Sequence, residues 1–237
     1  MSSPAEPKVA IVTGGGRGIG AAVVRELHAR GYRLSLMSPS DSADKLAAEL
    51  GEIGVRGSVA ELADLRKLVD ETLAAHGRID ALVNNPGHLP AGELLDLSDE
   101  TWAGAFDQVL LSVIRLCRLV TPVMQRQGGG AIVNITTAST FEPTLRFPVS
   151  ATLRAGLSAF TKLYAERYAG EAIRMNCVLP GAIDSLEHGE ARRLSIPSKR
   201  IGRVEEIAKT VAFLLSEDAG YIVGQSLRVD GGETRHV

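Results

Sequence analysis

Apolar residues recur along the chain with two alternating spacings. The segment "KVAIVTGGG", residues 8–16, is a short apolar run that ends in glycines, as a buried β-strand does. The next segment, "GIGAAVVRELHARG", places apolar residues at helical spacing from Ile19 to Leu27 and ends at Gly31. These two patterns predict a strand, a glycine turn and a helix in succession.

The same alternation continues to the C-terminus. The segment 183–202 breaks it, because it carries Pro197 and mixed charges, and we expect a loop or lid there with a short helix over "EHGEARRL". Strands are predicted at residues 33–38, 54–59, 79–85, 130–136, 173–181 and 226–232. Helices are predicted at about 43–51, 62–77, 106–124, 150–168 and 204–215.

Strands that alternate with helices indicate a parallel sheet covered on both faces, because parallel neighbours need helical crossovers. No internal repeat, low-complexity tract or linker divides the sequence. We therefore expect one α/β domain over residues 1–237, a Rossmann fold with a doubly wound parallel sheet of about seven strands.

The net charge and the N-terminal segment limit which partners and which cellular location we expect. Lysine and arginine total 26 against 28 acidic residues, and the net charge of -2 gives no general attraction to nucleic acid or an acidic membrane. The N-terminal segment has no basic region followed by a long apolar run, and no apolar stretch reaches the about 18 residues of a membrane span. We expect a cytoplasmic protein that acts on a small molecule or another protein.

Cysteine usage adds no metal or redox chemistry. The two cysteines, Cys117 and Cys177, lie in apolar segments without CxxC spacing. We expect two buried, reduced thiols and no metal site.

The glycine segment "TGGGRGIG" carries the first candidate chemistry. Glycine permits a tight turn and a close backbone approach, and a helix N-terminus presents free N–H groups and a positive dipole to a pyrophosphate. Because a strand precedes the segment and a helix follows it, the context favours a dinucleotide site. The predicted binding residues are Gly14, Gly16, Arg17, Gly18, Ile19 and Gly20.

The end of the second strand decides which dinucleotide fits. An acidic residue there would bind the 2'-hydroxyl of NAD and repel a 2'-phosphate, but the strand ends at Ser38, followed by Pro39 and Ser40. Arg17 in the glycine turn can make charge-assisted bonds to a phosphate. The sequence therefore favours NADP over NAD.

These and later motifs resemble the short-chain dehydrogenase/reductase family over nearly the whole chain. The matching segments are "TGGGRGIG", "NNPG" at 84–87, "GAIVNIT", "RMNCVLPGAI" and "VDGG". The resemblance implies that Asn85 and Gly87 border the cofactor and that Pro180 and Gly181 face its nicotinamide. Pro86 stands where the family has alanine, which removes one backbone N–H donor.

The resemblance also locates the family's catalytic residues and shows that they are replaced. Arg154 aligns with the lysine, Ser150 with the tyrosine four residues earlier, and Thr137 with the serine thirteen residues before that. Val109 aligns with the asparagine that organises a water. Shifting the frame by one residue would place Val149 and Leu153 at the pair, which restores neither side chain.

The replacements are not chemically equivalent. A tyrosine has a pKa of about 10, whereas an unassisted serine hydroxyl holds its proton far more tightly, much as water does. Arg154 keeps its charge and can hold ribose or phosphate oxygens, and Thr137 can donate one hydrogen bond to a carbonyl. Val109 cannot hold a water.

Three other side chains are candidates for the missing acid. His88 follows "NNPG" at the sheet edge that binds ligands, and histidine is a common general acid or base. Glu142 and His188 flank the same region. Tyr164 and Tyr168 lie too far along the helix from Arg154 and are expected to pack.

Two interpretations remain. One is an NADP(H)-dependent enzyme acting on a carbonyl or alcohol with an impaired or rearranged proton relay; the other is an inactive cofactor-binding subunit or sensor paired with an active relative. Neither identifies a substrate. The apolar helices near 109–124 and 153–169 predict a homo-oligomer or a hetero-oligomer with a related subunit.

Overall fold

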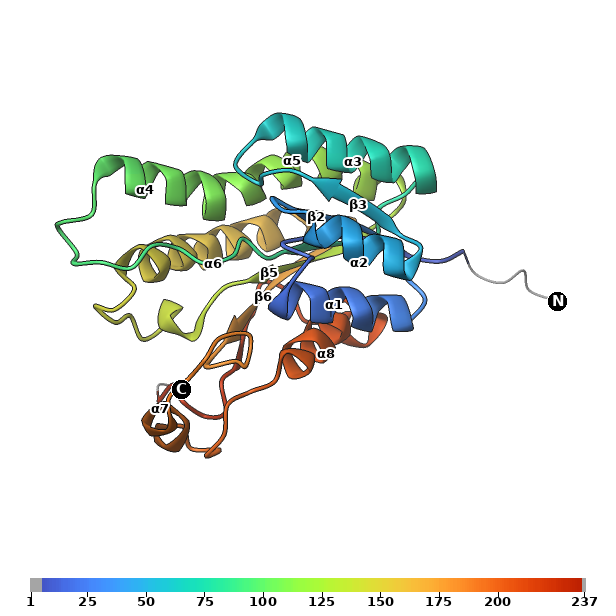
Figure 1. The fold of residues 1–237 in the computed structure, drawn as a ribbon. Helices are drawn as coiled ribbons and strands as arrows, with labels where there is room; N and C mark the ends of the chain where they lie inside the picture. Colours follow the sequence, from blue (N-terminus) through green and yellow to red (C-terminus); the bar gives the residue numbers. More distant parts are fainter. Residues whose placement is uncertain (1–5, 236–237) are drawn as a thin grey trace.

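The computed structural model describes residues 6–235 and arranges them around one parallel sheet (Figure 1). The sheet has seven strands in the order β3-β2-β1-β4-β5-β6-β7, which confirms the predicted doubly wound Rossmann fold. Residues 1–5, on which the expectation of no export signal partly rests, and residues 236–237, the end of the predicted domain, lie outside the described residues.

The observed elements follow the predicted alternation closely. The strands are β1 Val9–Thr13, β2 Arg33–Ser38, β3 Ile53–Arg56, β4 Ala81–Asn84, β5 Gly130–Ile135, β6 Ile173–Pro180 and β7 Ser226–Val229. The α-helices are α1 Gly18–Ala29, α2 Ser42–Leu50, α3 Leu62–His76, α4 Asp99–Phe106, α5 Ser112–Arg126, α6 Pro148–Tyr168, α7 Glu190–Ser195 and α8 Val204–Leu215.

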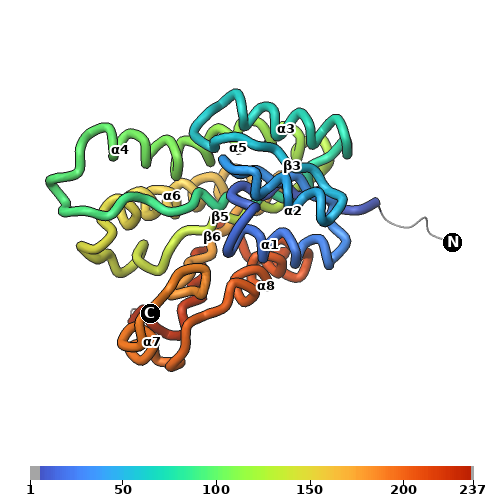
Figure 2. The backbone as a smooth tube through the Cα atoms, in the orientation of Figure 1, coloured from blue at the N-terminus to red at the C-terminus, as the bar shows by residue number. Residues whose placement is uncertain are grey.

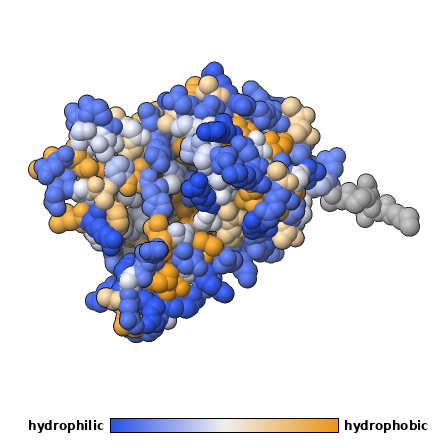
Figure 3. Space-filling model, viewed as in Figure 1, coloured by the Kyte–Doolittle hydropathy of each residue, from blue (hydrophilic) through white to orange (hydrophobic). Residues whose placement is uncertain are grey.

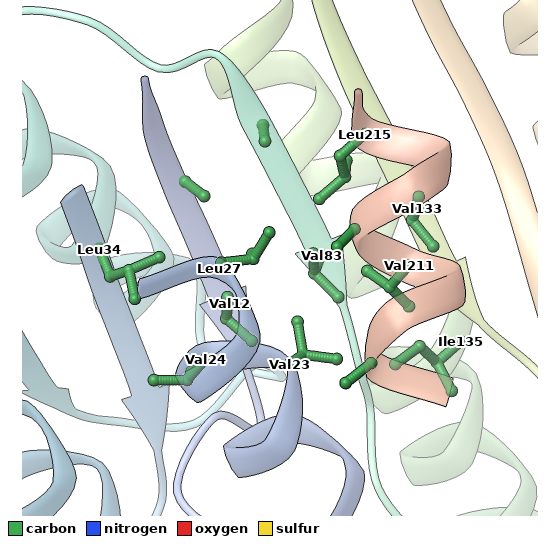
Figure 4. Packing of buried hydrophobic residues seen from close by; sticks show 14 of the residues in the cluster. Val12, Val23, Val24, Leu27, Leu34, Val83, Val133, Ile135, Val211 and Leu215 are labelled. Atoms are coloured by element: carbon green, nitrogen blue, oxygen red, sulfur yellow. The ribbon is translucent and has the colours of Figure 1, made fainter. Parts of the chain in front are cut away.

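Most residues of β1, β2, β4, β5 and β6 are buried, because helices cover both faces of the sheet. Along β1, Ala10 and Val12 join the core under α1, α2 and α8, whereas Ile11 joins the core under α3, α5 and α6. Figure 4 shows the first core at close range, where side chains of β1, β4 and β5 meet those of α1 and α8. The labelled members are Val12, Val23, Val24, Leu27, Leu34, Val83, Val133, Ile135, Val211 and Leu215.

One predicted helix is interrupted in the structure. The segment 106–124 was expected to be continuous, but a π-helical stretch, Asp107–Leu111, separates α4 from α5. Ser98 caps α4 by accepting a hydrogen bond from the Thr101 N–H at 3.3 Å, a start that the apolar pattern alone did not reveal. A π-helical turn inserts one extra residue per turn and changes the direction of the following side chains.

The region predicted as a loop or lid contains the short helix α7, as expected. In Figure 2 this segment projects from the rest of the molecule beside the C-terminal end of the chain. Backbone and side-chain contacts join the two, because Ser198 N–H donates to the Gly231 carbonyl at 3.1 Å and Arg192 pairs with Glu233.

The surface is mixed in polarity, and both cysteines are buried. On the face shown in Figure 3, hydrophobic side chains are scattered among hydrophilic ones. None of the described helices is both long enough and apolar enough to cross a bilayer. Cys117 and Cys177 are buried, free thiols.

Candidate active site

The glycine turn after β1 is closed too tightly for side chains, as the surroundings of Gly14 and Gly20 show. A Cβ added to Gly14 would meet the carbonyl oxygen of Asn85, and one added to Gly20 would meet the carbonyl oxygen of Gly14. Gly14 and Gly18 also adopt positive φ angles of 58° and 49°, which L side chains rarely adopt. The backbone geometry therefore requires the glycines that the sequence placed there.

Helix α1 starts directly after this turn. Arg17 occupies its N-cap position with extended backbone and makes no side-chain cap hydrogen bond. The first N–H groups of a helix lack partners within the helix, so this end can receive a phosphate. The structure thus brings Gly14, Gly16, Arg17, Gly18, Ile19 and Gly20 together at the start of α1, as predicted.

A hollow of about 390 Å³ lies beside the turn, between α1 and α2. Two of its basic side chains are paired: Arg25 with Glu49 at 2.7 Å and Lys45 with Asp41 at 2.8 Å. Arg17 forms no ion pair within residues 6–235 and only reaches Ser40 Oγ, at 3.5 Å. Arg17 is therefore the cation that this hollow offers to an anion. The lining residues are Gly16, Arg17, Ala21, Arg25, Asp41, Ser42, Lys45, Leu46 and Glu49.

The sequence predicts Ser38 as a direct contact for a cofactor, whereas in the structure its hydroxyl is bonded within the protein. It is buried, its Oγ donates to the Ser40 carbonyl at 2.7 Å, and the same oxygen accepts from Ala43 N–H at 3.1 Å. Ser38 thus shapes the turn into α2. The nearest acid, Asp41, receives a hydrogen bond from Lys45 that lowers the pKa of its carboxyl, and the pairing offsets its charge.

The loop after β4 is tied to the glycine turn. Asn85 N–H donates to Thr13 Oγ1 at 3.0 Å, and the Asn85 side chain donates to the Gly14 carbonyl at 3.2 Å. Gly87, two residues on, has a φ of 79°. Asn85 and Gly87 therefore lie at the carboxyl edge between β1 and β4, where the strand order reverses and ligands bind in such sheets.

A buried polar chain fixes helix α6 against the centre of the sheet. Asn84 Nδ2 donates to Asn134 Oδ1 at 2.7 Å, and Asn134 Nδ2 donates to Thr161 Oγ1 at 2.8 Å. Thr161 in turn donates to the Leu157 carbonyl within α6 at 2.9 Å. Buried networks of this kind rigidify their surroundings, so the part of α6 around Thr161 is held relative to β4 and β5.

Arg154 is the central side chain of the altered catalytic region. Only 7% of it is exposed, and its guanidinium donates to the carbonyls of Ile135 at 2.8 Å and Gly87 at 2.5 Å. Its Nε donates to Ser150 Oγ at 3.2 Å. No carboxylate pairs with it in the described chain; burial lowers its pKa to about 10, which still leaves it a cation at neutral pH.

Ser150 and Thr137 present their hydroxyl hydrogens in the same way. Ser150 Oγ accepts from Arg154, and Thr137 Oγ1 accepts from the Ser139 N–H at 3.4 Å. Neither hydroxyl donates to another described residue. The turn that follows Thr137 contacts α6, and Arg154 also donates to the neighbouring Thr136 carbonyl at 3.3 Å. This end of the site therefore combines a buried cation with two available O–H donors.

Val109 contributes packing instead of polar chemistry, because it is fully buried in the core. Its neighbour Gln108 lies in the π-helical turn and donates to the Pro86 carbonyl at 2.5 Å. The same Nε2 lies 3.4 Å from the His88 carbonyl. Gln108 was missed by sequence reasoning, since nothing in the apolar pattern signalled the π-helical turn that places it.

The alternative acids lie in less enclosed surroundings. His88 is exposed, Glu142 Oε1 accepts from the Arg235 N–H at 2.6 Å, and His188 Nε2 lies 2.8 Å from the Ile183 carbonyl. Their predicted role as proton donor stays a prediction. Tyr164 packs as expected: its hydroxyl lies 2.5 Å from Thr121 Oγ1, and burial raises its pKa above the usual range.

The strand end at Pro180 completes the edge. Gly181 N–H donates to the Val229 carbonyl at 3.1 Å, and a Cβ at Gly181 would lie 2.8 Å from the Asp230 Cα. Close packing of β6 on the segment after β7 therefore requires glycine here. Pro180 and Gly181 lie at the same sheet edge as the ends of β4 and β5, and their contact with a nicotinamide stays a prediction.

Comparison with known proteins agrees with this geometry over nearly the full chain. A family model described as enoyl-(acyl carrier protein) reductase matches residues 14–234. A 7alpha-hydroxysteroid dehydrogenase of Bacteroides fragilis is 35% identical, with 98% of this chain and 96% of that protein covered. The 3-oxoacyl-(acyl-carrier-protein) reductase FabG of Haemophilus influenzae is 35% identical, covering 95% and 97%. Dehydrogenase/reductase SDR family member 4 of Bos taurus is 34% identical, covering 99% and 90%.

Proposed function

The chain belongs to the short-chain dehydrogenase/reductase family of oxidoreductases, and from that premise we propose that it binds NADP(H) and acts on a small carbonyl or alcohol compound. The single observation that supports the cofactor assignment is the glycine turn at the start of α1. There side chains would collide with the backbone, and helix N–H groups are available to a phosphate. When bound, NADP(H) supplies hydride transfer.

The residues present fit this cofactor at both of its phosphate positions. The turn from Gly14 to Gly20 and the first N–H groups of α1 would hold the pyrophosphate. Arg17 would bind the 2'-phosphate, because it borders the hollow without a carboxylate partner in the described chain. Ser38 brings no negative charge to this corner. Pro180 and Gly181 would border the nicotinamide, by analogy with the family.

The names of the relatives support a carbonyl or alcohol substrate without choosing one. They describe a dehydrogenase acting on a hydroxysteroid and reductases acting on 3-oxoacyl groups, which are both alcohol–carbonyl interconversions. In this chain Ser150 and Thr137 would donate hydrogen bonds to the substrate oxygen, while Arg154 holds Ser150. Because no tyrosine stands at Ser150, the proton relay for such a reaction would be slow.

A second candidate is the inactive cofactor-binding subunit. It is supported by the carbonyl contacts of Arg154, since a side chain bound to Ile135 and Gly87 stabilises the fold whether or not chemistry occurs. Saturable NADPH binding without hydride transfer to any ketone, alcohol, acyl thioester or conjugated carbonyl would favour this candidate. Steady turnover with one of them would exclude it.

We further propose that the protein is cytoplasmic and assembles as a homo-oligomer or with a related subunit. Exposed apolar side chains on the α4–α6 side support assembly, because Leu163 on α6 is 66% exposed and Phe106 at the end of α4 is 39% exposed. Light scattering at micromolar concentration measures this directly. A monomer mass would exclude the homo-oligomer and leave only a heteromeric partner.

Isothermal titration with NADPH and NADH tests the cofactor assignment. We expect NADPH to bind more tightly than NADH. Arg17→Ala should weaken NADPH binding by about 10-fold, because one charge-assisted contact is lost, and should change NADH binding little. Arg25→Ala is the matched control, because Arg25 borders the same hollow but is already paired with Glu49. Equal or tighter binding of NADH to the unaltered protein would overturn the preference.

A further inference from the structure

Arg154 is a buried cation for which the described chain supplies no anion. None of the ion pairs within residues 6–235 includes this side chain, of which only 7% is exposed. Its hydrogen bonds go to the Ser150 hydroxyl and to the backbone carbonyls of Ile135, Thr136 and Gly87. Carbonyl dipoles solvate a guanidinium but leave its net charge in place, and an uncompensated buried charge is costly. An anion beside Arg154 would therefore be attracted more than at an exposed arginine.

The first turn of α6 adds to this positive potential. Phe147 at the N-cap position makes no side-chain cap hydrogen bond, and Pro148 follows it. The next backbone N–H groups, those of Val149 and Ser150, have no partner within the helix, and they lie at the positive end of the helix dipole. Ser150 Oγ also accepts the Nε–H of Arg154 at 3.2 Å, so the helix start and the buried cation meet at Ser150.

The loop before α6 contributes one further cation and one acid that is already bonded. Glu142 is the only acid in residues 136–147, and its Oε1 accepts the Arg235 N–H at 2.6 Å. Arg146 forms no ion pair within the described chain, and its guanidinium lies 5.0 Å from the ring centroid of Phe147. Positive charge therefore exceeds negative charge around the start of α6.

Two hydroxyls next to Arg154 are available as donors to a ligand. Ser150 is half-buried, and its hydrogen is not donated to any residue from 6 to 235. Thr137 also donates to none of them, and it follows Thr136, whose carbonyl Arg154 contacts at 3.3 Å. A hydroxyl whose oxygen accepts from a cation is polarised and becomes a better donor, which applies to Ser150.

These features indicate that the negative charge at this site comes from a ligand. A tyrosine at position 150 could ionise beside a cation and balance it, whereas a serine hydroxyl keeps its proton. We propose that the site around Ser150 and Arg154 binds a carboxylate. Ser150 would donate its O–H to a carboxylate oxygen, and Arg154 would act through Ser150 as a positioning residue and as the buried countercharge.

The carboxylate site also names a substrate class, which rests on the function proposed above. With Thr137 donating to the reacting oxygen beside the carboxylate, the substrates would be 2-oxo acids or 2-hydroxy acids. The carbonyl carbon of a 2-oxo acid would gain the hydride of NADPH, the carbonyl π pair would move to oxygen, and that oxygen would take a proton from water. The 2-oxo acid is reduced by two electrons to a 2-hydroxy acid, NADPH is oxidised to NADP+, and hydroxide is left in the solvent. The carboxylate itself is unchanged.

Benzoate and benzamide are the matched probes for binding, because they are alike in size and shape and differ in charge. NMR titration of the full-length protein without nucleotide at pH 7 measures both, so the result does not depend on NADP(H). We expect benzoate to bind at least about 10-fold more tightly, from one charge-assisted contact, and to shift the amide signals of Val149 and Ser150. Equal binding of the two probes, or shifts confined to other residues, would overturn the proposal.

Two serine variants on α6 assign the contact. Ser150→Ala should weaken benzoate binding by about 10-fold, because the O–H donor to the carboxylate is lost. Ser158→Ala is the control, because Ser158 lies on the same helix with its Oγ directed to Cys177, and it should leave benzoate binding unchanged. Equal binding by the two variants would show that Ser150 does not contact the carboxylate.

Moving the negative charge into the protein tests the same idea without a ligand. Ser150→Asp should pair with Arg154 and melt at a higher temperature than Ser150→Asn, which has the same shape without the charge. The difference should persist at about 1 M NaCl, because salt screens an exposed helix end far more than a buried pair. The aspartate variant should also lose its preference for benzoate. A melting difference that is absent, or that salt removes, would mean that Arg154 does not require an anion.

Turnover separates this inference from the proposed function. With saturating NADPH, benzoylformate should be reduced with a kcat/KM at least about 10-fold higher than that of benzoylformamide, mainly through a lower KM, because the carboxylate adds binding. If benzoylformamide is reduced as well as benzoylformate, the oxidoreductase function stands and the substrate class is wrong. If benzoate binds at Ser150 but neither nucleotide binds, the carboxylate site stands and the proposed function fails.

Discussion

The cofactor end and the chemical end of the site lie on one sheet edge, but they keep the family's residues to different degrees. At the cofactor end, the close approaches of Gly14 and Gly20 are fixed by backbone atoms, and every glycine of the pattern is present. At the chemical end, the functional groups are side chains, and Ser150 and Arg154 stand where the family has tyrosine and lysine. A site built from backbone changes only if the fold changes, whereas a site built from side chains can change its chemistry within an intact fold.

The replacements at the chemical end are structurally integrated. Arg154 joins the ends of β4 and β5 to helix α6 through the carbonyls of Gly87 and Ile135. Gln108 holds the same loop from the π-helical turn through the Pro86 carbonyl. The loop from 86 to 88 is therefore fixed by direct side-chain contacts. Substitutions at the cofactor end and at the chemical end test the comparison between them.

The largest effect is expected at the cofactor end. Gly18→Asp places a carboxylate at the N-terminus of α1, where the pyrophosphate would lie, and should weaken NADPH binding by more than about 100-fold through charge repulsion. The control is Gly31→Asp, which has a similar positive φ of 82° but open space around it. Titration calorimetry on both variants measures the difference; unchanged affinity in Gly18→Asp would place the nucleotide elsewhere.

Removing the buried cation should give the next largest effect. Arg154→Met leaves the carbonyls of Ile135 and Gly87 without their donor, and we expect a loss of about 3 kcal/mol in the free energy of unfolding. Urea denaturation measures it. On the same helix, Arg167→Met removes an exposed pair with Glu171 and an exposed contact with the Tyr168 ring, and should change stability by less than about 1 kcal/mol. Equal effects of the two variants would mean that Arg154 does not hold the strand ends.

A smaller effect is expected at the π-helical turn. Gln108→Leu removes the donor to the Pro86 carbonyl and should cost about 1 kcal/mol. The local consequence is more informative, because the amides of Gly87 and His88 should exchange faster with solvent. Gln225→Leu, which removes an exposed contact to the nearby Val223 carbonyl, should leave exchange at Gly87 and His88 unchanged. Unchanged exchange in Gln108→Leu as well would show that Gln108 does not fix this loop.

Sequence reasoning reached the fold and the cofactor end because both depend on local patterns. The apolar alternation predicted a parallel sheet, because parallel strands need crossover helices. The glycines predicted where α1 starts. It did not give the π-helical turn or the contacts of Gln108, which depend on how α4 and α5 pack. Nor could it show that the Ser38 hydroxyl turns inward, because that follows from the short turn into α2.

The catalytic region shows the same limit in another form. The resemblance located Thr137, Ser150 and Arg154 by spacing, and the structure places Arg154 in contact with Ser150 at 3.2 Å. Spacing could not tell that the guanidinium donates to the carbonyls of Ile135 and Gly87, because those partners come from strand β5 and from the loop after β4. The hydrogen-bond directions, which decide the chemistry, required the folded chain.

The measurement that tests the account most directly is NADPH consumption with isolated ketones at pH 7 by the unaltered protein and by the double variant Ser150→Tyr with Arg154→Lys. The account predicts little or no consumption by the unaltered protein, well below tens per second, and at least about a 10-fold gain in the double variant, in which a phenol can donate the proton. Ketone reduction by the unaltered protein at tens per second, surviving His88→Ala and Glu142→Ala, would contradict the claim that its chemical end lacks a working proton relay.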